Sequence, residues 1–199
     1  MITSTTDICN LALGHLGEAP ITSLDEDSRA ARACALHFVP ARDAVLRSHR
    51  WNFAETRVAL SRLAEPPPFG WAHQYPLPAD CLRVLEVNGS EEGDWLSNEY
   101  RIEGRLVLAN VDTVNLVYTR LEEDVSAYDP LFIEALTLKL GALLSEPIRG
   151  TTGKTADLMS QYERVTAPLA RRVDANEGRR RKGILPMNST FIRARGCGV

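Results

Sequence analysis

The 199-residue sequence has no long apolar run and few cysteines, and we expect no secretory leader. No stretch reaches the roughly 18 apolar residues of a membrane-spanning helix, so we expect no membrane span. The first residues hold neither the basic nor the apolar segment of a signal peptide. The four cysteines stand singly, at Cys9, Cys34, Cys81 and Cys197, too far apart in sequence to predict a zinc site or a redox pair. We therefore expect reduced thiols, three of them in core positions, in a cytosolic protein.

Motifs that carry enzyme chemistry are missing as well. The sequence has no Gly-x-Ser-x-Gly around a serine nucleophile and no His-Glu-x-x-His zinc motif. Gly153-Lys154-Thr155 matches the end of a phosphate-binding loop, but that loop needs a glycine where the sequence has Ile148. The acidic run at residues 25–27 lacks the spaced oxygen ligands of a calcium loop. We assign no catalytic residue, no metal ligand and no cofactor, and we expect a protein that is not an enzyme.

Charge is distributed unevenly along a chain of otherwise ordinary composition. Hydrophobic residues make up 44% and charged residues 25%, as in a soluble globular protein that buries a core. Residues 164–195 hold nine basic and two acidic side chains, a net charge of +7, so with a total of −3 the rest of the chain carries −10. This split predicts an acidic body and a basic C-terminal arm that meets an anionic partner. A solvated helix end followed by a loose tail is the alternative.

Residues 1–65 are predicted to hold two helices. The capping pair Ser4 and Asp7 opens the first helix. The second is expected to start at the pair Ser23-x-x-Glu26 and to reach about residue 50, with a stripe of small residues that lets another helix approach closely. The first helix is expected to face the core with the residues at i, i+3, i+4, i+7 and i+8, which are Ile8, Leu11, Ala12, His15 and Leu16.

Residues 66–120 change to period-two alternation and predict a small antiparallel sheet inserted between helices. Helices resume in residues 121–178. Asp129 followed by Pro130 is a strong helix start, and the residues up to Leu144 are apolar on nearly every face, which is typical of the middle of a bundle. The last helix is expected to bury a stripe of five residues, Leu158, Tyr162, Val165, Leu169 and Val173.

The predicted fold class is therefore mainly α (α+β): a four-helix-type bundle from residues 1–65 and 121–178, with a small antiparallel β insertion at 66–120 and an extended basic C-terminal arm at 179–199. The arm has no interleaved aromatic residues, so base-specific recognition is not expected, whereas phosphates or an acidic protein surface would suit it. Its apolar residues suit a partner's groove or sheet edge. The candidate partner-binding residues are Arg179, Arg180, Arg181, Lys182, Ile184, Leu185, Phe191, Ile192 and Arg193.

Four stretches carry a resemblance to a known family. They are residues 9–18 (CNLALGHLGE) with 21–27 (ITSLDED), 44–47 (AVLR) with 51–54 (WNFA), 75–84 (YPLPADCLRV), and 128–132 (YDPLF) with the helix that follows. Together, and in this order, they resemble the head-to-tail adaptor, or tail tubular protein A-like, subunits of podovirus-type tailed bacteriophages. The resemblance spans roughly residues 5–175.

This resemblance implies a structural, non-enzymatic subunit of the virion, made in the cytoplasm of the bacterial host. Relatives assemble as a ring of twelve copies below the portal protein, extend the channel through which DNA passes without specific contacts, and give the tail nozzle or a later tail protein a platform. A subunit of this kind can be a monomer in isolation. In relatives the C-terminal extension reaches toward the portal, so the basic arm is the expected portal contact. The alternative is a nucleic-acid-binding accessory protein that acts through the same arm; an enzyme with an unrecognised site is a third possibility.

Overall fold

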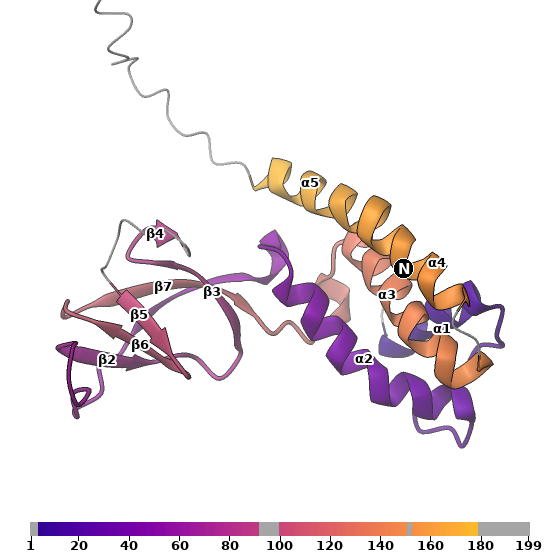
Figure 1. The fold of residues 1–199 in the computed structure, drawn as a ribbon, viewed down its shortest axis with the longest axis horizontal. Helices are drawn as coiled ribbons and strands as arrows, with labels where there is room; N and C mark the ends of the chain where they lie inside the picture. Colours follow the sequence, from indigo (N-terminus) through magenta and orange to yellow (C-terminus); the bar gives the residue numbers. More distant parts are fainter. Residues whose placement is uncertain (1–3, 92–99, 151–152, 179–199) are drawn as a thin grey trace, which may run out of the picture.

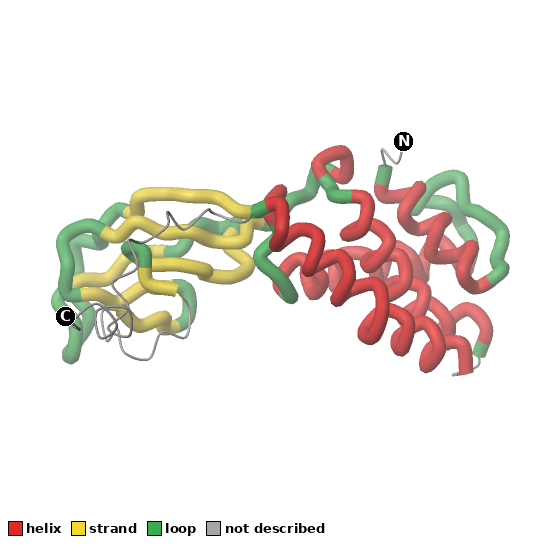
Figure 2. Tube along the Cα trace, turned by 90° about the horizontal axis from the view of Figure 1, so that it is seen from above, coloured by secondary structure: helices red, strands yellow, loops and turns green. Residues whose placement is uncertain are grey.

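The computed structural model describes residues 4–91, 100–150 and 153–178. Figures 1 and 2 show an elongated molecule with helices gathered at one end and strands at the other. The fold is thus mixed α+β, as the sequence predicts. The helices are α1 (Thr5–Leu16), α2 (Arg29–Arg47), α3 (Pro130–Arg149), α4 (Gly153–Gln161) and α5 (Ala167–Glu177), with a π-helical turn (Tyr162–Thr166) between α4 and α5 and short 3-10 turns at Asn52–Ala54 (η1) and Val125–Ala127 (η2).

Local capping sets the starts of two helices as predicted. At α1, the Ser4 side chain accepts from the backbone N–H of Asp7 while the Asp7 carboxylate accepts from that of Ser4, at 3.1 and 3.0 Å. At α3, Asp129 caps the first turn and Pro130 follows it. The predicted start of α2 is wrong, because Ser28 is its N-cap, and the earlier Glu26 instead accepts bonds from Thr22.

Helix α3 lies at the centre of the helical end, which confirms the prediction for this segment. It contacts α1, α2, α4 and α5, and five of its large apolar side chains are fully buried: Phe132, Leu136, Leu138, Leu140 and Leu144. Helices α1 and α4 both approach α3 closely at Gly141. A Cβ added there would lie 3.3 Å from both the Ala12 carbonyl oxygen and the Leu158 Cδ1 atom. The apolar character of α3 on nearly every face therefore follows from having neighbours on several sides.

The π-helical turn corrects the predicted stripe of the last helix. Leu158 and Tyr162 are buried as expected, but Val165 is 59% exposed and Leu169 is 39% exposed. A π turn adds one residue to a helical turn, so it rotates every later residue relative to the predicted α-helical spacing. The buried face continues instead through Thr166, Ala167, Ala170 and Asp174.

The strands form two antiparallel sheets, where the sequence predicts one. Their order is β1-β7-β3-β4 in the first sheet and β2-β6-β5 in the second. The strands are β1 (Glu55–Leu60), β2 (His73–Pro76), β3 (Cys81–Val87), β4 (Ser90–Glu91), β5 (Tyr100–Glu103), β6 (Leu106–Ala109) and β7 (Val114–Arg120). The two sheets share a second apolar core, which includes Tyr75 and Val107 from one sheet and Val84, Leu116 and Tyr118 from the other.

Strand β1 also lies earlier than predicted, within the range 1–65 that the sequence assigns to helices. It pairs along its whole length with β7, from Glu55 opposite Thr119 to Leu60 opposite Val114. No side chain of β1 is fully buried, so its alternation is weak in the sequence. Pairing with a strand some 60 residues later holds it in place instead.

Candidate interaction surfaces

The nine residues predicted to bind a partner, between Arg179 and Arg193, lie outside the described residues. The structure does fix the point from which this segment begins. Helix α5 ends at Glu177, and the described chain ends at Gly178, where an added Cβ would lie only 2.2 Å from Asn52 Oδ1. The C-terminal segment therefore starts where the helices meet the strands (Figure 1).

Asp174 anchors the end of α5 at this junction. It is 5% exposed, and its carboxylate accepts a hydrogen bond from the Asn52 backbone N–H at 3.0 Å. The other carboxylate oxygen lies 3.1 Å from His49 Nε2, and the Asp174 backbone carbonyl accepts from Asn52 Nδ2 at 2.6 Å. A buried carboxylate with two partners of this kind is satisfied rather than free to act on a substrate. We interpret this cluster as a structural anchor.

His49, the partner of Asp174, also belongs to an aromatic cluster. The His49 ring stands edge-on to Trp51, with centroids 4.9 Å apart, and Trp51 stands edge-on to Phe132 of α3 at 5.1 Å. Phe53 and Tyr128 complete the cluster around Phe132. The segment between α2 and β1 is thus packed directly on the first turn of α3, so the helical end and the strands are held together by buried rings.

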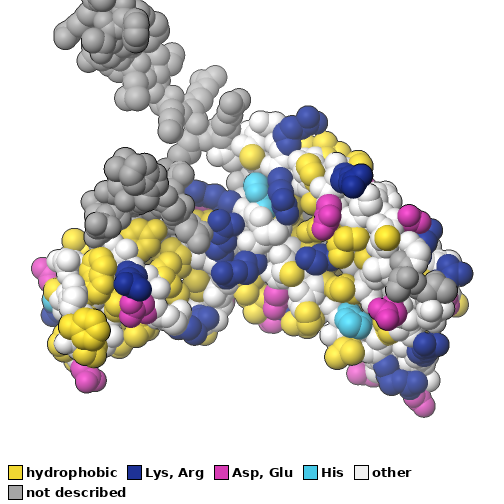
Figure 3. All heavy atoms as spheres, in the orientation of Figure 1, with side chains coloured by type: hydrophobic (Ala, Val, Ile, Leu, Met, Phe, Trp, Pro, Cys, Tyr) yellow, Lys and Arg dark blue, Asp and Glu magenta, His cyan; other side chains and the backbone are white. Residues whose placement is uncertain are grey.

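Ion pairs join the same junction to the four-stranded sheet. The Arg50 guanidinium donates to Glu55 of β1 at 2.8 Å and lies 2.6 Å from Glu86 of β3. Hydrogen bonding to Arg50 lowers the pKa of Glu55, and Arg57 adds to the effect. Figure 3 shows basic side chains gathered on this face where the strands meet the helices. The network ties the segment that follows α2 to two strands at once.

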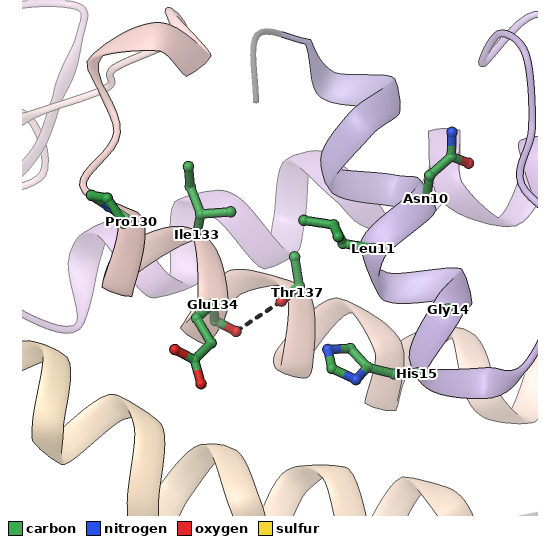
Figure 4. A pocket seen from close by; sticks show the side chains of 8 residues that line it. All are labelled: Asn10, Leu11, Gly14, His15, Pro130, Ile133, Glu134 and Thr137. Atoms are coloured by element: carbon green, nitrogen blue, oxygen red, sulfur yellow. Dashed lines mark hydrogen bonds between the residues drawn. The ribbon is translucent and has the colours of Figure 1, made fainter. Parts of the chain in front are cut away.

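A shallow groove opens between α1 and α3. Its volume is about 470 Å³, and it is mainly apolar. The lining residues are Asn10, Leu11, Gly14, His15, Pro130, Ile133, Glu134 and Thr137. Figure 4 shows Leu11, Ile133 and Thr137 along the groove, and the Thr137 hydroxyl donates to the Glu134 carbonyl at 2.9 Å. The sequence places Leu11 on the core-facing stripe of α1, but it is 45% exposed here.

The polar groups of the groove differ in charge. Partial burial lowers the pKa of His15, and nearby Lys154 lowers it further against the opposing effect of Glu134. The imidazole is therefore held toward its neutral form at pH 7, while Glu134 is exposed and supplies a negative charge at the edge of an apolar floor. The groove therefore combines an apolar floor with a neutral imidazole, the Glu134 carboxylate and the nearby Lys154 ammonium group.

Helix α2 exposes two aliphatic side chains to solvent. Leu36 is 69% exposed and Val39 is 47% exposed, on the side of the helix away from its buried residues. Arg32 lies one turn before Leu36, and Arg47 lies two turns after Val39. We call these four residues the α2 ridge. Arg32 pairs with Asp27, Arg47 donates to the Leu82 carbonyl, and the partly buried Asp43 lies on the same face between Val39 and Arg47.

Two buried thiols lie together although they are 25 positions apart in the sequence. Cys9 of α1 and Cys34 of α2 are both fully buried. A hydrogen bond to Cys34 and burial raise the pKa of the Cys9 thiol, so it stays protonated at neutral pH. The sequence predicts core thiols but does not predict that these two are neighbours, because their contact depends on how α1 and α2 are placed.

The described residues contain no group of three or more His, Cys, Asp or Glu side chains that could hold a metal ion. No helix in the described ranges has the length and apolar character needed to cross a membrane. A scan against models of protein families finds no match to the chain, and a search of curated proteins finds none either. The surfaces described above and the resemblance carried by the four sequence stretches are therefore the basis for a functional proposal.

Proposed function

We propose that this chain is a structural head-to-tail adaptor subunit of a tailed bacteriophage. In this proposal copies form a ring below the portal protein, extend the DNA channel and provide the platform on which a tail protein docks. The observation that carries the proposal is the set of four family-like stretches, since each one includes residues that position the elements of this fold. The proposal extends from those residues to the assembly.

Each of these stretches contains a residue that positions an element of the fold. In the first, the Asn10 side chain both accepts from and donates to the backbone of Ile21, at 2.8 and 3.0 Å, and so fixes the turn after α1. In the second, Trp51 is almost completely buried against α3. In the third, Asp80 accepts from the Tyr118 hydroxyl at 3.1 Å. In the fourth, Asp129 caps α3.

The arrangement of the helices supports the finer fold assignment. The α4–α5 segment is continuous through the π-helical turn, so the described residues form four long helical segments, and the other three all pack on α3. We interpret them as a four-helix-type bundle into which the β region is inserted. The strands lie at the far end of the molecule from most of the helices (Figure 2), which suits a subunit that contacts different partners at its two ends.

The C-terminal segment is the proposed portal contact. Residues 179–199 carry six basic side chains and no acidic ones, and they follow a helix end that Asp174 and Asn52 hold in place. A segment that starts from a fixed point loses less conformational freedom on binding than one that starts from a mobile helix. Basic residues with apolar neighbours such as Phe191 and Ile192 suit an acidic protein surface that has apolar pockets.

Binding of the full-length chain to its cognate portal protein tests the proposal. We expect the wild-type chain to co-sediment with the portal, and a variant in which the four basic residues 179–182 are replaced by serine to bind more weakly. The alternative, a nucleic-acid-binding accessory protein, is favoured by the net charge of the segment alone. It predicts tight DNA binding that falls steeply with salt and is lost in the same variant, with no portal binding.

A further inference from the structure

Two cationic side chains lie together where α5 packs on α3 (Figure 1). Lys139 of α3 and Arg171 of α5 are both half-buried. The Lys139 Nζ atom lies 5.4 Å from the centre of the buried Tyr162 ring. Burial lowers the pKa of Lys139, and the positive charge of Arg171 lowers it further, so the two cations are close enough to repel each other.

The π-helical turn places Arg171 on the side of the helical segment that faces Lys139. In this widened turn the Ala167 N–H donates to the Tyr162 carbonyl five residues earlier. Tyr162 and Arg171 are nine residues apart, so in a regular α-helix they would lie about 180° from each other. The extra residue of the π turn moves Arg171 about 100° back toward the Tyr162 side. The turn, a frequent feature of functional sites, thus brings the two cations together.

Neither cation forms an ion pair with a carboxylate in the part of the chain that the structure describes. The Nε atom of Arg171 is buried and has no hydrogen-bond partner there. Asp174 lies one turn further along α5, but its two oxygens are engaged in the anchor at the junction. Glu163 is exposed and only partly offsets the effect of Arg171 on the pKa of Lys139. The pair therefore carries positive charge and a buried N–H group that no described residue fully balances.

Exposed cations such as Arg164 and Arg172 need no such partner, because water hydrates them. Lys139 and Arg171 differ in being half-buried, where hydration is incomplete and an oxyanion partner stabilises a cation more strongly. The guanidinium of arginine presents a fork of N–H donors that fits two oxygens of one anion, and the lysine ammonium adds a point charge. A phosphate group, with a charge of about −1.5 to −2 at pH 7, balances two cations, whereas a carboxylate balances one.

We propose that Lys139 and Arg171 form a binding site for a phosphate group, supplied as the free ion or as the terminal phosphate of a small molecule. On binding, the guanidinium turns so that Nε and one Nη donate to two phosphate oxygens, which gives the buried N–H an acceptor. The Lys139 Nζ atom donates to a third oxygen. The inference is independent of the proposed function, because it concerns one copy of the chain without a portal protein.

Titration of the 15N-labelled full-length chain with sodium phosphate tests the site, with pH constant and ionic strength held constant by sodium chloride. We expect saturable shifts of the amide signals around Lys139, Tyr162 and Arg171. Glycerol phosphate separates the two sources: shifts with both ligands assign the site to terminal phosphates, and shifts with inorganic phosphate alone assign it to the free ion. Sodium acetate at the same ionic strength should produce no saturable shift. No saturable shift with either phosphate, or equal responses to phosphate and acetate, would overturn the proposal.

Replacing either cation should weaken the binding. Lys139→Met keeps an unbranched chain beside the Tyr162 ring, and Arg171→Met keeps the aliphatic stem, so both variants should fold. Each should weaken phosphate binding at least about tenfold, the loss expected for one charge-assisted hydrogen bond. Arg172→Met is the matched control, since it removes an exposed cation from the next position of α5 and should bind as wild type. Binding that survives in both cation variants, or that falls equally in the control, would contradict the site.

Thermal unfolding gives a second reading on the same proteins. Phosphate at ten times its dissociation constant should raise the midpoint of the wild-type chain by about 3–6 °C, and that of Lys139→Met by less than about half as much. Equal gains in the two proteins refute the site and leave the adaptor function standing. Portal binding that fails in the wild-type chain refutes the function and leaves the phosphate site standing, so the two claims are tested apart.

Discussion

Replacing Asp174 by alanine should destabilise the protein by about 2–3 kcal/mol. The change removes two acceptor oxygens, one bonded to the Asn52 backbone N–H at 3.0 Å and one that lies 3.1 Å from His49 Nε2. A net hydrogen bond contributes about 0.5–1.5 kcal/mol, and leaving a buried donor without a partner costs about 1–3 kcal/mol. Because Asp174 is 5% exposed, water does not readily replace the lost oxygens.

Urea unfolding followed by circular dichroism measures this loss directly. For a chain of this length, the same loss should lower the midpoint of thermal unfolding by about 4–12 °C. Hydrogen exchange gives a local measure, since the Asn52 amide should exchange faster in the alanine variant than in wild type. The loosened end of α5 should also weaken portal binding if the C-terminal segment depends on a fixed starting point.

Asp174→Asn is the matched control for the role of the acceptor oxygen. The amide keeps one oxygen for the Asn52 N–H and presents its NH2 group to His49, whose neutral ring can accept at Nε2. We expect a cost below about 1 kcal/mol, since one bond is kept and the other is reversed. Equal losses in the alanine and asparagine variants would refute this reasoning and assign the anchor to charge, and no loss in either would show that the anchor does not hold α5.

Three further changes test other parts of the fold. Leu136→Ala, at a fully buried position of α3, should cost about 2–5 kcal/mol, and an unchanged unfolding midpoint would place α3 outside the centre. Arg50→Met should cost about 2–3 kcal/mol at pH 7, because it removes the cation that pairs with Glu86 and leaves Glu55 with Arg57 alone. Because Arg50 lowers the pKa of Glu55, that stability is present above the unfolded pKa and is lost as pH falls through the folded one, so urea midpoints of wild type and variant should converge in acid. Deleting Val165 from the π-helical turn restores α-helical spacing and should cost less stability than deleting Arg172 from the regular part of α5.

Local signals explain which helices the sequence predicts well. The cap and proline at Asp129 and Pro130 act within one turn, and burial of α3 on most sides leaves a strong apolar pattern. The start of α2 shows the limit of such signals, because Ser23 and Ser28 both stand before a helical pattern. Ser28 is the N-cap of α2, while Glu26 accepts a hydrogen bond from Thr22 in the preceding turn and does not pair with Ser23 in a capping box. The spacing of residues in the sequence does not reveal that contact.

Long-range contacts explain what the sequence does not predict. Strand β1 depends on pairing with β7, and the division into two sheets depends on the pairing of β6 with β2 and β5. The π-helical turn shifts the buried face by one residue, which no periodic pattern anticipates. The groove joins Leu11 to Ile133 across more than 100 residues of sequence, so neither residue alone indicates a surface. Composition alone identifies the basic C-terminal segment, and its residues lie outside the described part of the chain.

Electron microscopy of the full-length chain mixed with its cognate portal protein tests the central claim most directly. The account predicts a ring of additional density on one face of the portal, with one copy of this chain for each portal subunit, and loss of that ring when residues 179–182 are changed to serine. Portal particles that stay bare at saturating concentrations of the wild-type chain would contradict the assignment as a head-to-tail adaptor.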